Sequence, residues 1–182
     1  MSRYPSHADP SGLTPEQRPI YDAMIASRGR LQGPAHVLLN HPKLHARMGP
    51  FTDYIVSGST LPDDLREFVT LLVTRFFGAQ YGYTIHLARA RKAGVPEAAI
   101  AAIRDRQPIP GLGDRERIAE TMVHELLTTH ALSDETYAEA LQAFGLPSLI
   151  DLSMTIGCYA MLAQLMNTFQ IEPAPGETPL PQ

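Results

Sequence analysis

The chain has 182 residues, and its 15 Lys and Arg residues against 19 Asp and Glu residues give a formal net charge of −4. This length suits one domain with a proper core, while the weakly acidic, scattered charge argues against a nucleic-acid surface or a polybasic membrane patch. The single cysteine, Cys158, excludes an intrachain disulfide and a two-thiol redox centre within one subunit, which predicts a reducing, cytoplasmic location.

The N-terminal part predicts a polar arm followed by short helices. Residues 1–12 lack an apolar segment and are expected to form a flexible arm rather than a signal peptide. Capping residues, first-turn prolines and apolar spacing predict three helices after the arm, over residues 15–27, 35–39 and 42–56. Gly49-Pro50 is expected to kink or split the third.

The stretch from Pro62 to Gly94 concentrates the unusual residues of the chain. Its spacing predicts two helices, over residues 62–76 and 80–93. The first is too densely apolar for one exposed face, so it is expected to be buried. Glu67 lies on the first helix and His86 on the second.

Glu67 and His86 each have a functional and a structural interpretation. His86, Gly82 and Ala79 share one helical face, and the two small residues leave room for a ligand or for a closely packed helix. Glu67 pointing outward would be an ordinary first-turn acid. If it points inward, an unpaired buried carboxylate is costly, and either protonation or a hydrogen bond from His86 would relieve that cost.

The remainder of the chain predicts helices and a proline-rich tail. The predicted helices cover residues 96–103, 114–129, 133–145 and 149–169. The last has no charged residue after Asp151, yet it is too polar for a lipid environment, so it is expected to be buried within the protein or between subunits. No alternating pattern is evident, so we predict an all-α domain over residues 13–171 with a tail over 172–182.

The spacing of Glu67, Ala79, Gly82 and His86 resembles that of the carboxymuconolactone decarboxylase and alkylhydroperoxidase D superfamily, over about residues 35 to 170. In the peroxidase branch the two small positions are the cysteines of a CxxC motif. Ala79 and Gly82 stand there in this chain, so it looks like the cysteine-free branch. The resemblance implies an alkylhydroperoxidase D-like helical bundle and a homo-oligomer, a trimer or hexamer.

The resemblance also implies roles for individual residues. Glu67 and His86 would be the catalytic pair, with His86 moving a proton and Glu67 fixing the tautomer of its ring. Tyr83 stands at the usual aromatic position of the family and is the first candidate for the pocket. The full set of expected substrate-binding residues is Tyr83, Gln80, Arg75 and Tyr159.

The resulting hypothesis is a cofactor-independent lyase or decarboxylase that acts on a small lactone or carboxylic acid, with no metal. The segment His124 to Thr128 begins like a zinc-protease signature but lacks the second histidine. A lactone hydrolase or isomerase using the same pair, and a non-catalytic ligand-binding protein, remain alternatives. A thiol peroxidase is disfavoured because the CxxC motif is absent.

Overall fold

The computed structural model describes residues 3, 10–29, 31, 33–173 and 180–181, and over these residues the chain is all-α, as predicted. The α-helices are α1 (Arg18–Arg28), α2 (Pro34–Leu38), α3 (Pro42–Asp53), α4 (Asp63–Phe76), α5 (Gln80–Ala93), α6 (Glu97–Asp105), α7 (Asp114–Thr128) and α8 (Asp134–Thr168). Most of the expected N-terminal arm and C-terminal tail lies outside the described residues.

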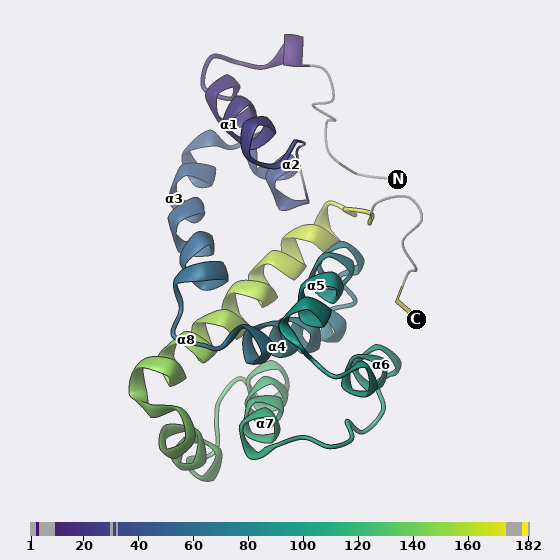
Figure 1. Cartoon of the computed structure of the whole chain (residues 1–182). Coiled ribbons are helices and arrows are strands. Elements are labelled where there is room, and N and C mark those ends of the chain that lie inside the picture. The colour runs from purple at the N-terminus through teal and green to yellow at the C-terminus, as the bar shows by residue number, and fades with distance from the viewer. Residues whose placement is uncertain (1–2, 4–9, 30, 32, 174–179, 182) are drawn as a thin grey trace.

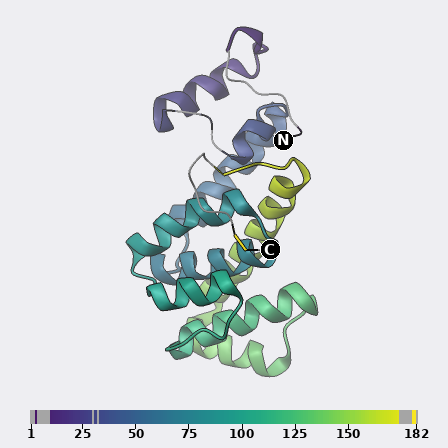
Figure 2. The ribbon, with the colours of Figure 1, turned by 90° about the vertical axis from the view of Figure 1, so that its right-hand side faces the viewer.

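Helix α4 is the centre of the fold. It packs against α5, α6, α7 and α8, which surround it in Figures 1 and 2. Val69, Leu71 and Val73 are completely buried, because α4 is apolar on several faces and has neighbours on each of them. The expected burial of this helix is therefore confirmed.

A tight break turns α4 back into α5. Gly78 adopts a left-handed conformation with φ of 60°, and the Ala79 backbone N–H donates to the Thr74 carbonyl over 2.9 Å. The two helices therefore run back along each other, which brings residues 19 positions apart in sequence onto facing surfaces.

The predicted helices over 133–145 and 149–169 form one kinked element, α8. Gly145 interrupts the helical backbone with φ of 71° and ψ of 163°, and Pro147 follows within the element. The second half packs on α4, yet large apolar side chains on α8 stay exposed in the single chain. These are Tyr137, Leu141, Leu146, Ile150, Met154 and Met161.

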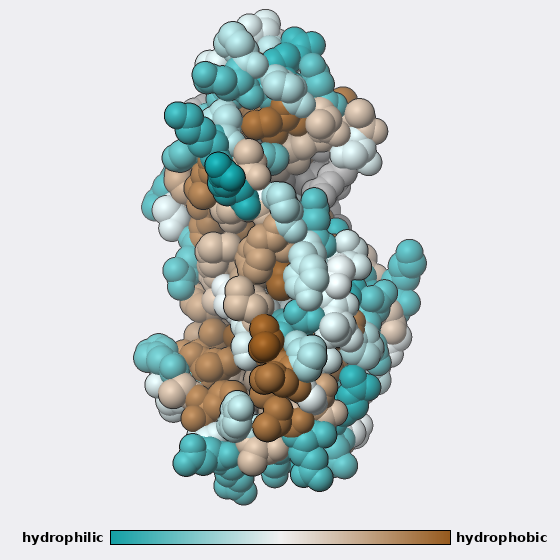
Figure 3. Space-filling view, turned by 90° about the vertical axis from the view of Figure 1, so that its left-hand side faces the viewer, coloured by the Kyte–Doolittle hydropathy of each residue, from teal (hydrophilic) through white to brown (hydrophobic). Residues whose placement is uncertain are grey.

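Figure 3 shows apolar side chains gathered on the side of the molecule that carries α3 and the kink of α8. Among the described residues, α8 alone is long and apolar enough to cross a membrane, and half of its most apolar window is buried inside the protein. The core helix of a soluble protein has the same properties, so length and composition carry no membrane assignment. Within one chain the helix is therefore only partly buried, and its burial between subunits stays a prediction.

The N-terminal helices form a smaller unit beside this core. Met24, Leu31 and Leu39 make a separate apolar cluster that joins α1 to the segment around α2. Helix α1 begins at Arg18, three residues later than predicted, because residues 15–17 form a turn. The side chain of Gln17 accepts a hydrogen bond from the Thr14 backbone within that turn.

Helix α3 continues through Pro50 to Asp53 and then loosens into a π-helical turn, Tyr54–Gly58. The predicted kink at Gly49-Pro50 therefore does not split the helix. Asp151 of α8 anchors the end of the turn, accepting hydrogen bonds from the Tyr54 hydroxyl at 2.8 Å and the Thr60 backbone at 2.7 Å. These bonds hold α3 at a fixed distance from α8.

Candidate functional site

Glu67 and His86 meet across the interface of α4 and α5. His86 Nδ1 lies 2.7 Å from Glu67 Oε2, and the two residues are 7% and 4% exposed. The contact expected from the sequence is therefore confirmed. It follows from the tight turn at Gly78, which folds the two helices face to face, and from the need of a buried carboxyl group for a partner.

Burial lowers the pKa of His86, whereas the hydrogen bond and the charge of Glu67 raise it, and the charges of Arg89 and Arg66 lower it again. The net direction is downward, so the ring is neutral around pH 7. When Nδ1–H donates to the Glu67 carboxylate, Nε2 keeps its lone pair. That nitrogen is then able to accept a proton.

A cavity of about 610 Å³ adjoins this pair, and both His86 and Tyr159 line it. The two rings pack edge to face with centroids 4.8 Å apart. The other walls come from α1, α2, α3, α5 and α8. Their residues are Pro19, Ile20, Ala23, Met24, Ser27, Pro34, Ala35, Leu38, His45, Ala46, Met48, Gly49, Thr52, Asp53, Val56, Tyr81, Gly82, Ile85, Arg89, Leu162 and Met166.

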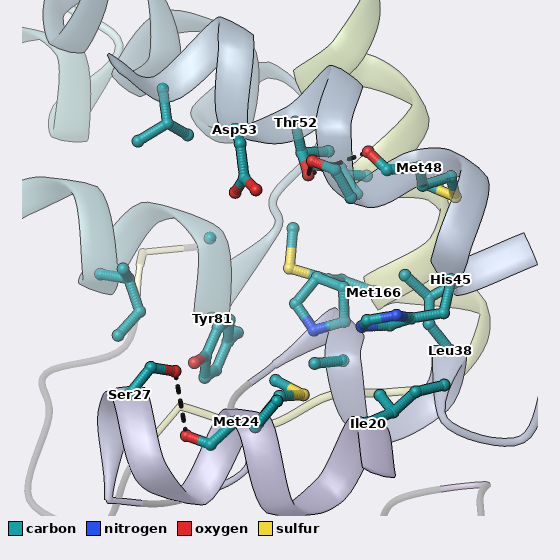
Figure 4. A pocket seen from close by; sticks show the side chains of 18 of the residues that line it. Ile20, Met24, Ser27, Leu38, His45, Met48, Thr52, Asp53, Tyr81 and Met166 are labelled. Carbon is teal, nitrogen blue, oxygen red and sulfur yellow. Dashed lines mark hydrogen bonds between the residues drawn. The ribbon is translucent and has the colours of Figure 1, made fainter. Parts of the chain in front are cut away.

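The cavity is apolar over most of its wall and polar at a few points. Figure 4 shows Met24, Met48 and Met166 around it, with His45 and Asp53 contributed by α3. Arg89 follows His86 by one helical turn and also lines the cavity. Such a space fits a small ligand with an apolar body and a polar or anionic group.

Tyr83 does not line this cavity, so the expectation that it would is wrong. Its side chain is 3% exposed, and its hydroxyl lies 3.4 Å from the Ile100 carbonyl, toward α6. Tyr81 lines the cavity instead. Two residues separated by two positions point to different sides of a helix, and the sequence pattern did not determine which side faces the void.

Two further expected substrate-binding residues lie elsewhere. The amide of Gln80 clamps Leu180 in the C-terminal segment: it accepts from the Leu180 N–H at 2.6 Å and donates to the Leu180 carbonyl at 3.3 Å. Arg75 donates from Nε to the Arg104 carbonyl at 2.7 Å and lines a different cavity. Of the four expected contacts, only Tyr159 adjoins His86.

The small residues beside His86 serve helix packing. A methyl group added to Gly82 would lie 2.8 Å from the Met166 methyl carbon and 3.1 Å from a methyl carbon of Thr74. Ala79 is completely buried. Of the two interpretations open from the sequence, close helix packing describes both positions, and Gly82 in addition lines the ligand-sized cavity.

No thiol lines the cavity. Cys158 is buried, and burial raises the pKa of its thiol to about 11, so it is protonated near neutral pH. Within the described part of the chain, no three residues among His, Cys, Asp and Glu converge in a way that would hold a metal ion. The groups available for chemistry are thus the imidazole, the carboxyl group and the hydroxyl groups around them.

Residues 42–125 match the model of the carboxymuconolactone decarboxylase family. Among solved structures, an uncharacterized peroxidase-related protein from Ralstonia eutropha JMP134, described as an alkylhydroperoxidase AhpD core, is similar with a TM-score of 0.77 and 13% identity. The match covers 96% of this chain and 93% of that one.

A second uncharacterized peroxidase-related protein, from Silicibacter sp. TM1040, has a TM-score of 0.76 at 15% identity, covering 96% and 92% of the two chains. The comparison with curated proteins gives no significant match. At these identities the structural likeness establishes the fold alone.

Proposed function

Because this chain belongs to the carboxymuconolactone decarboxylase and AhpD-like superfamily, we propose that it is a cofactor-independent acid–base lyase acting on a small lactone or carboxylic acid. One observation carries the proposal: the buried imidazole of His86, hydrogen-bonded over 2.7 Å to the buried Glu67 carboxyl group, lines a cavity that no thiol lines. General acid–base catalysis needs little more than such a pair beside the substrate.

His86 moves the proton in this proposal. In a decarboxylation, the bond to the carboxylate carbon breaks and its electron pair passes into the conjugated system as an enolate. His86, which is neutral at rest, takes up a proton from water at Nε2 and donates it to the carbon, which returns the ring to its neutral form, so one proton is consumed for each carbon dioxide released. Glu67 stabilises the transient imidazolium and keeps Nε2 directed away from itself.

Arg89 replaces Arg75 as the proposed partner of a substrate carboxylate. It lines the same cavity as His86 and lies near enough for its charge to lower the pKa of that ring. An arginine that bound the carboxylate about to leave would stabilise the ground state and slow decarboxylation. Arg89 is therefore proposed to bind a second carboxylate, one that the substrate keeps. The methionine-rich wall would accommodate the remaining apolar part.

A hydroxyl group must stabilise the oxygen of the enolate. Tyr159 is the best candidate, since burial and the charge of Glu67 raise its pKa more than its hydrogen bond with Thr70 lowers it, which keeps the hydroxyl protonated. Tyr81 is the second tyrosine in the wall of the cavity. Tyr81 thus joins Tyr159 at the substrate in place of Tyr83 and Gln80, which the sequence analysis had expected to bind it.

The test is a panel of lactones and unsaturated carboxylic acids assayed for carbon dioxide release and for ring opening. The His86→Gln variant should lose activity by about 10²-fold to 10⁴-fold while it keeps the helical circular-dichroism spectrum. His130→Asn is the matched control, because His130 is exposed and has a left-handed φ of 66° that asparagine tolerates. An active His86→Gln enzyme would exclude the proposed role.

The same panel separates the alternatives. Ring opening or rearrangement without carbon dioxide would indicate a hydrolase or isomerase that uses the same pair. Binding to the cavity without turnover of any compound would indicate a ligand-binding protein. Peroxide consumption with a dithiol reductant is expected to be absent, because Ala79 and Gly82 occupy the thiol positions.

We also propose that the chain forms a homo-oligomer through the exposed face of α8. Leu146, Ile150, Met154 and Met161 are each more than 40% exposed, and no charged residue lies between Asp151 and Glu172. An apolar surface of this kind is typical of subunit interfaces.

A further inference from the structure

We infer that a second cavity, between α4, α6 and α7, binds a small organic anion: a single carboxylate or phosphate group attached to an apolar body. The cavity has a volume of about 430 Å³ and shares no lining residue with the one beside His86. The inference is independent of the proposed catalytic function. It depends on two arginines whose positive charges meet at this cavity.

Arg75 is the central residue of the second cavity. It is only 6% exposed, and its Nε donates to the Arg104 carbonyl at the end of α6. Among the described residues no ion pair neutralises its guanidinium. Asp105, whose charge also acts on Arg75, is held by two hydrogen bonds from Arg104, at 2.8 and 2.7 Å.

Arg106 brings a second positive charge to the same cavity. It ends α6 in a left-handed conformation and lines the void together with Arg75. Burial lowers the pKa of Arg75, and the charge of Arg106, whose side chain is exposed, lowers it further, so the two guanidinium groups repel each other. An anion between them would replace this repulsion with two attractions and charge-assisted hydrogen bonds.

Helix α7 limits the charge of the ligand. Glu120 and His124 face the cavity from the opposite wall. Burial raises the pKa of Glu120, while the charge of His124 lowers it, with a net upward shift. Because Glu120 repels anions when it is ionised, the site suits a ligand with one anionic group, held near the arginines and away from α7.

The remaining wall recognises an apolar body. Leu72 and Phe76 of α4, Ile103 of α6, Ile109 of the following loop and Val123 of α7 line it. Phe76 is 44% exposed in spite of its size, so a bound ring or chain would cover apolar surface that now contacts water.

The test uses the full chain with methyl groups labelled for NMR, titrated with benzoate, phenyl phosphate and neutral benzyl alcohol. Methyl signals of Ile103, Ile109 and Val123 should shift with benzoate or phenyl phosphate, and much less with benzyl alcohol. The anion that binds with the higher affinity identifies the group that the site prefers. Shifts confined to the methionine methyls of the His86 cavity, or equal shifts with benzyl alcohol, would overturn the inference.

Variants distinguish binding at this anion site from non-specific binding. Arg106→Gln should weaken binding about tenfold or more, since a charge-assisted hydrogen bond contributes about 1.5 to 3 kcal/mol. Glu120→Gln should tighten binding, because it removes the repelling charge. His86→Gln should leave binding at this site unchanged. Affinity unaffected by Arg106→Gln, or weakened by Glu120→Gln, would contradict the assignment even if Arg75 variants fail to fold.

Discussion

The substitution Gly82→Ala tests whether close helix packing beside His86 limits the size of the cavity. The added carbon would lie 2.8 Å from the methyl carbon of Met166 and 3.1 Å from that of Thr74. Met166 is flexible and lines the cavity, so its methyl group should move into that space. Thr74 is fully buried and donates to the Thr70 carbonyl over 2.7 Å, so moving it would cost more free energy than moving Met166.

Two opposing terms set the magnitude for Gly82→Ala. Replacing a helical glycine by alanine gains about 0.8 to 1 kcal/mol in helix propensity, whereas an extra methyl group in a packed interior costs about 1 to 3 kcal/mol. We expect a net loss of about 1 kcal/mol in the free energy of unfolding. For a chain of this length that corresponds to a melting temperature about 2 to 4 °C lower.

Urea unfolding would measure the loss of stability, and ligand titration would measure the change in binding to the cavity beside His86. Gly49→Ala is the matched control, because Gly49 is helical, lines the same cavity and has no atom within 4 Å of the added carbon. The control should be neutral or stabilised, by up to about 1 kcal/mol. If Gly82→Ala is stabilised as much as the control, the packing argument is wrong. Weaker binding of ligands to the His86 cavity is expected only in the Gly82 variant.

Three further outcomes are expected. Hydrogen bonds from Thr60 and Tyr54 lower the pKa of Asp151 in spite of its burial, so the stability that they contribute is present at neutral pH and lost as the pH falls. In urea titrations, Asp151→Asn should have a smaller free energy of unfolding at pH 7 than the unchanged chain. Between pH 7 and pH 3 that free energy should fall less in the variant. Because the pKa of His86 is lowered from 6.5, unfolding free energy should fall as the pH drops below that value, and His86→Gln should flatten this fall. Ile150→Asp should yield smaller species in light scattering, and an unchanged mass would exclude this face of α8 as the subunit contact.

The sequence predicted most of the fold because its helix boundaries have local causes. Gly78 and Gly94 end α4 and α5 in left-handed conformations, and both breaks were expected from the glycines themselves. The start of α1 was misplaced by three residues, because a turn at Thr14 satisfies the capping pattern without a helix. At the kink in α8, the sequence predicted that one helix ends at Gly145 and that another begins at residue 149.

The site was only half predictable, for a physical reason. The contact of Glu67 with His86 follows from burial on two consecutive helices, which is a local property of the sequence. The walls from α1 and α3 depend on how distant segments pack, and no spacing encodes that. Arg89 was missed although it stands one turn after His86, a position that places both on one side of α5.

Arg75, which the sequence analysis assigned to the substrate, and Arg89, which it missed, line separate cavities. Arg75 is eight residues after Glu67 on α4, yet it faces α6 and α7, whereas Arg89 faces the imidazole from α5. A carboxylate therefore has one positive partner in the cavity beside His86 and two in the other. If the chain binds different anions at each, the shared helix α4 connects the two sites directly, since it carries both Glu67 and Arg75.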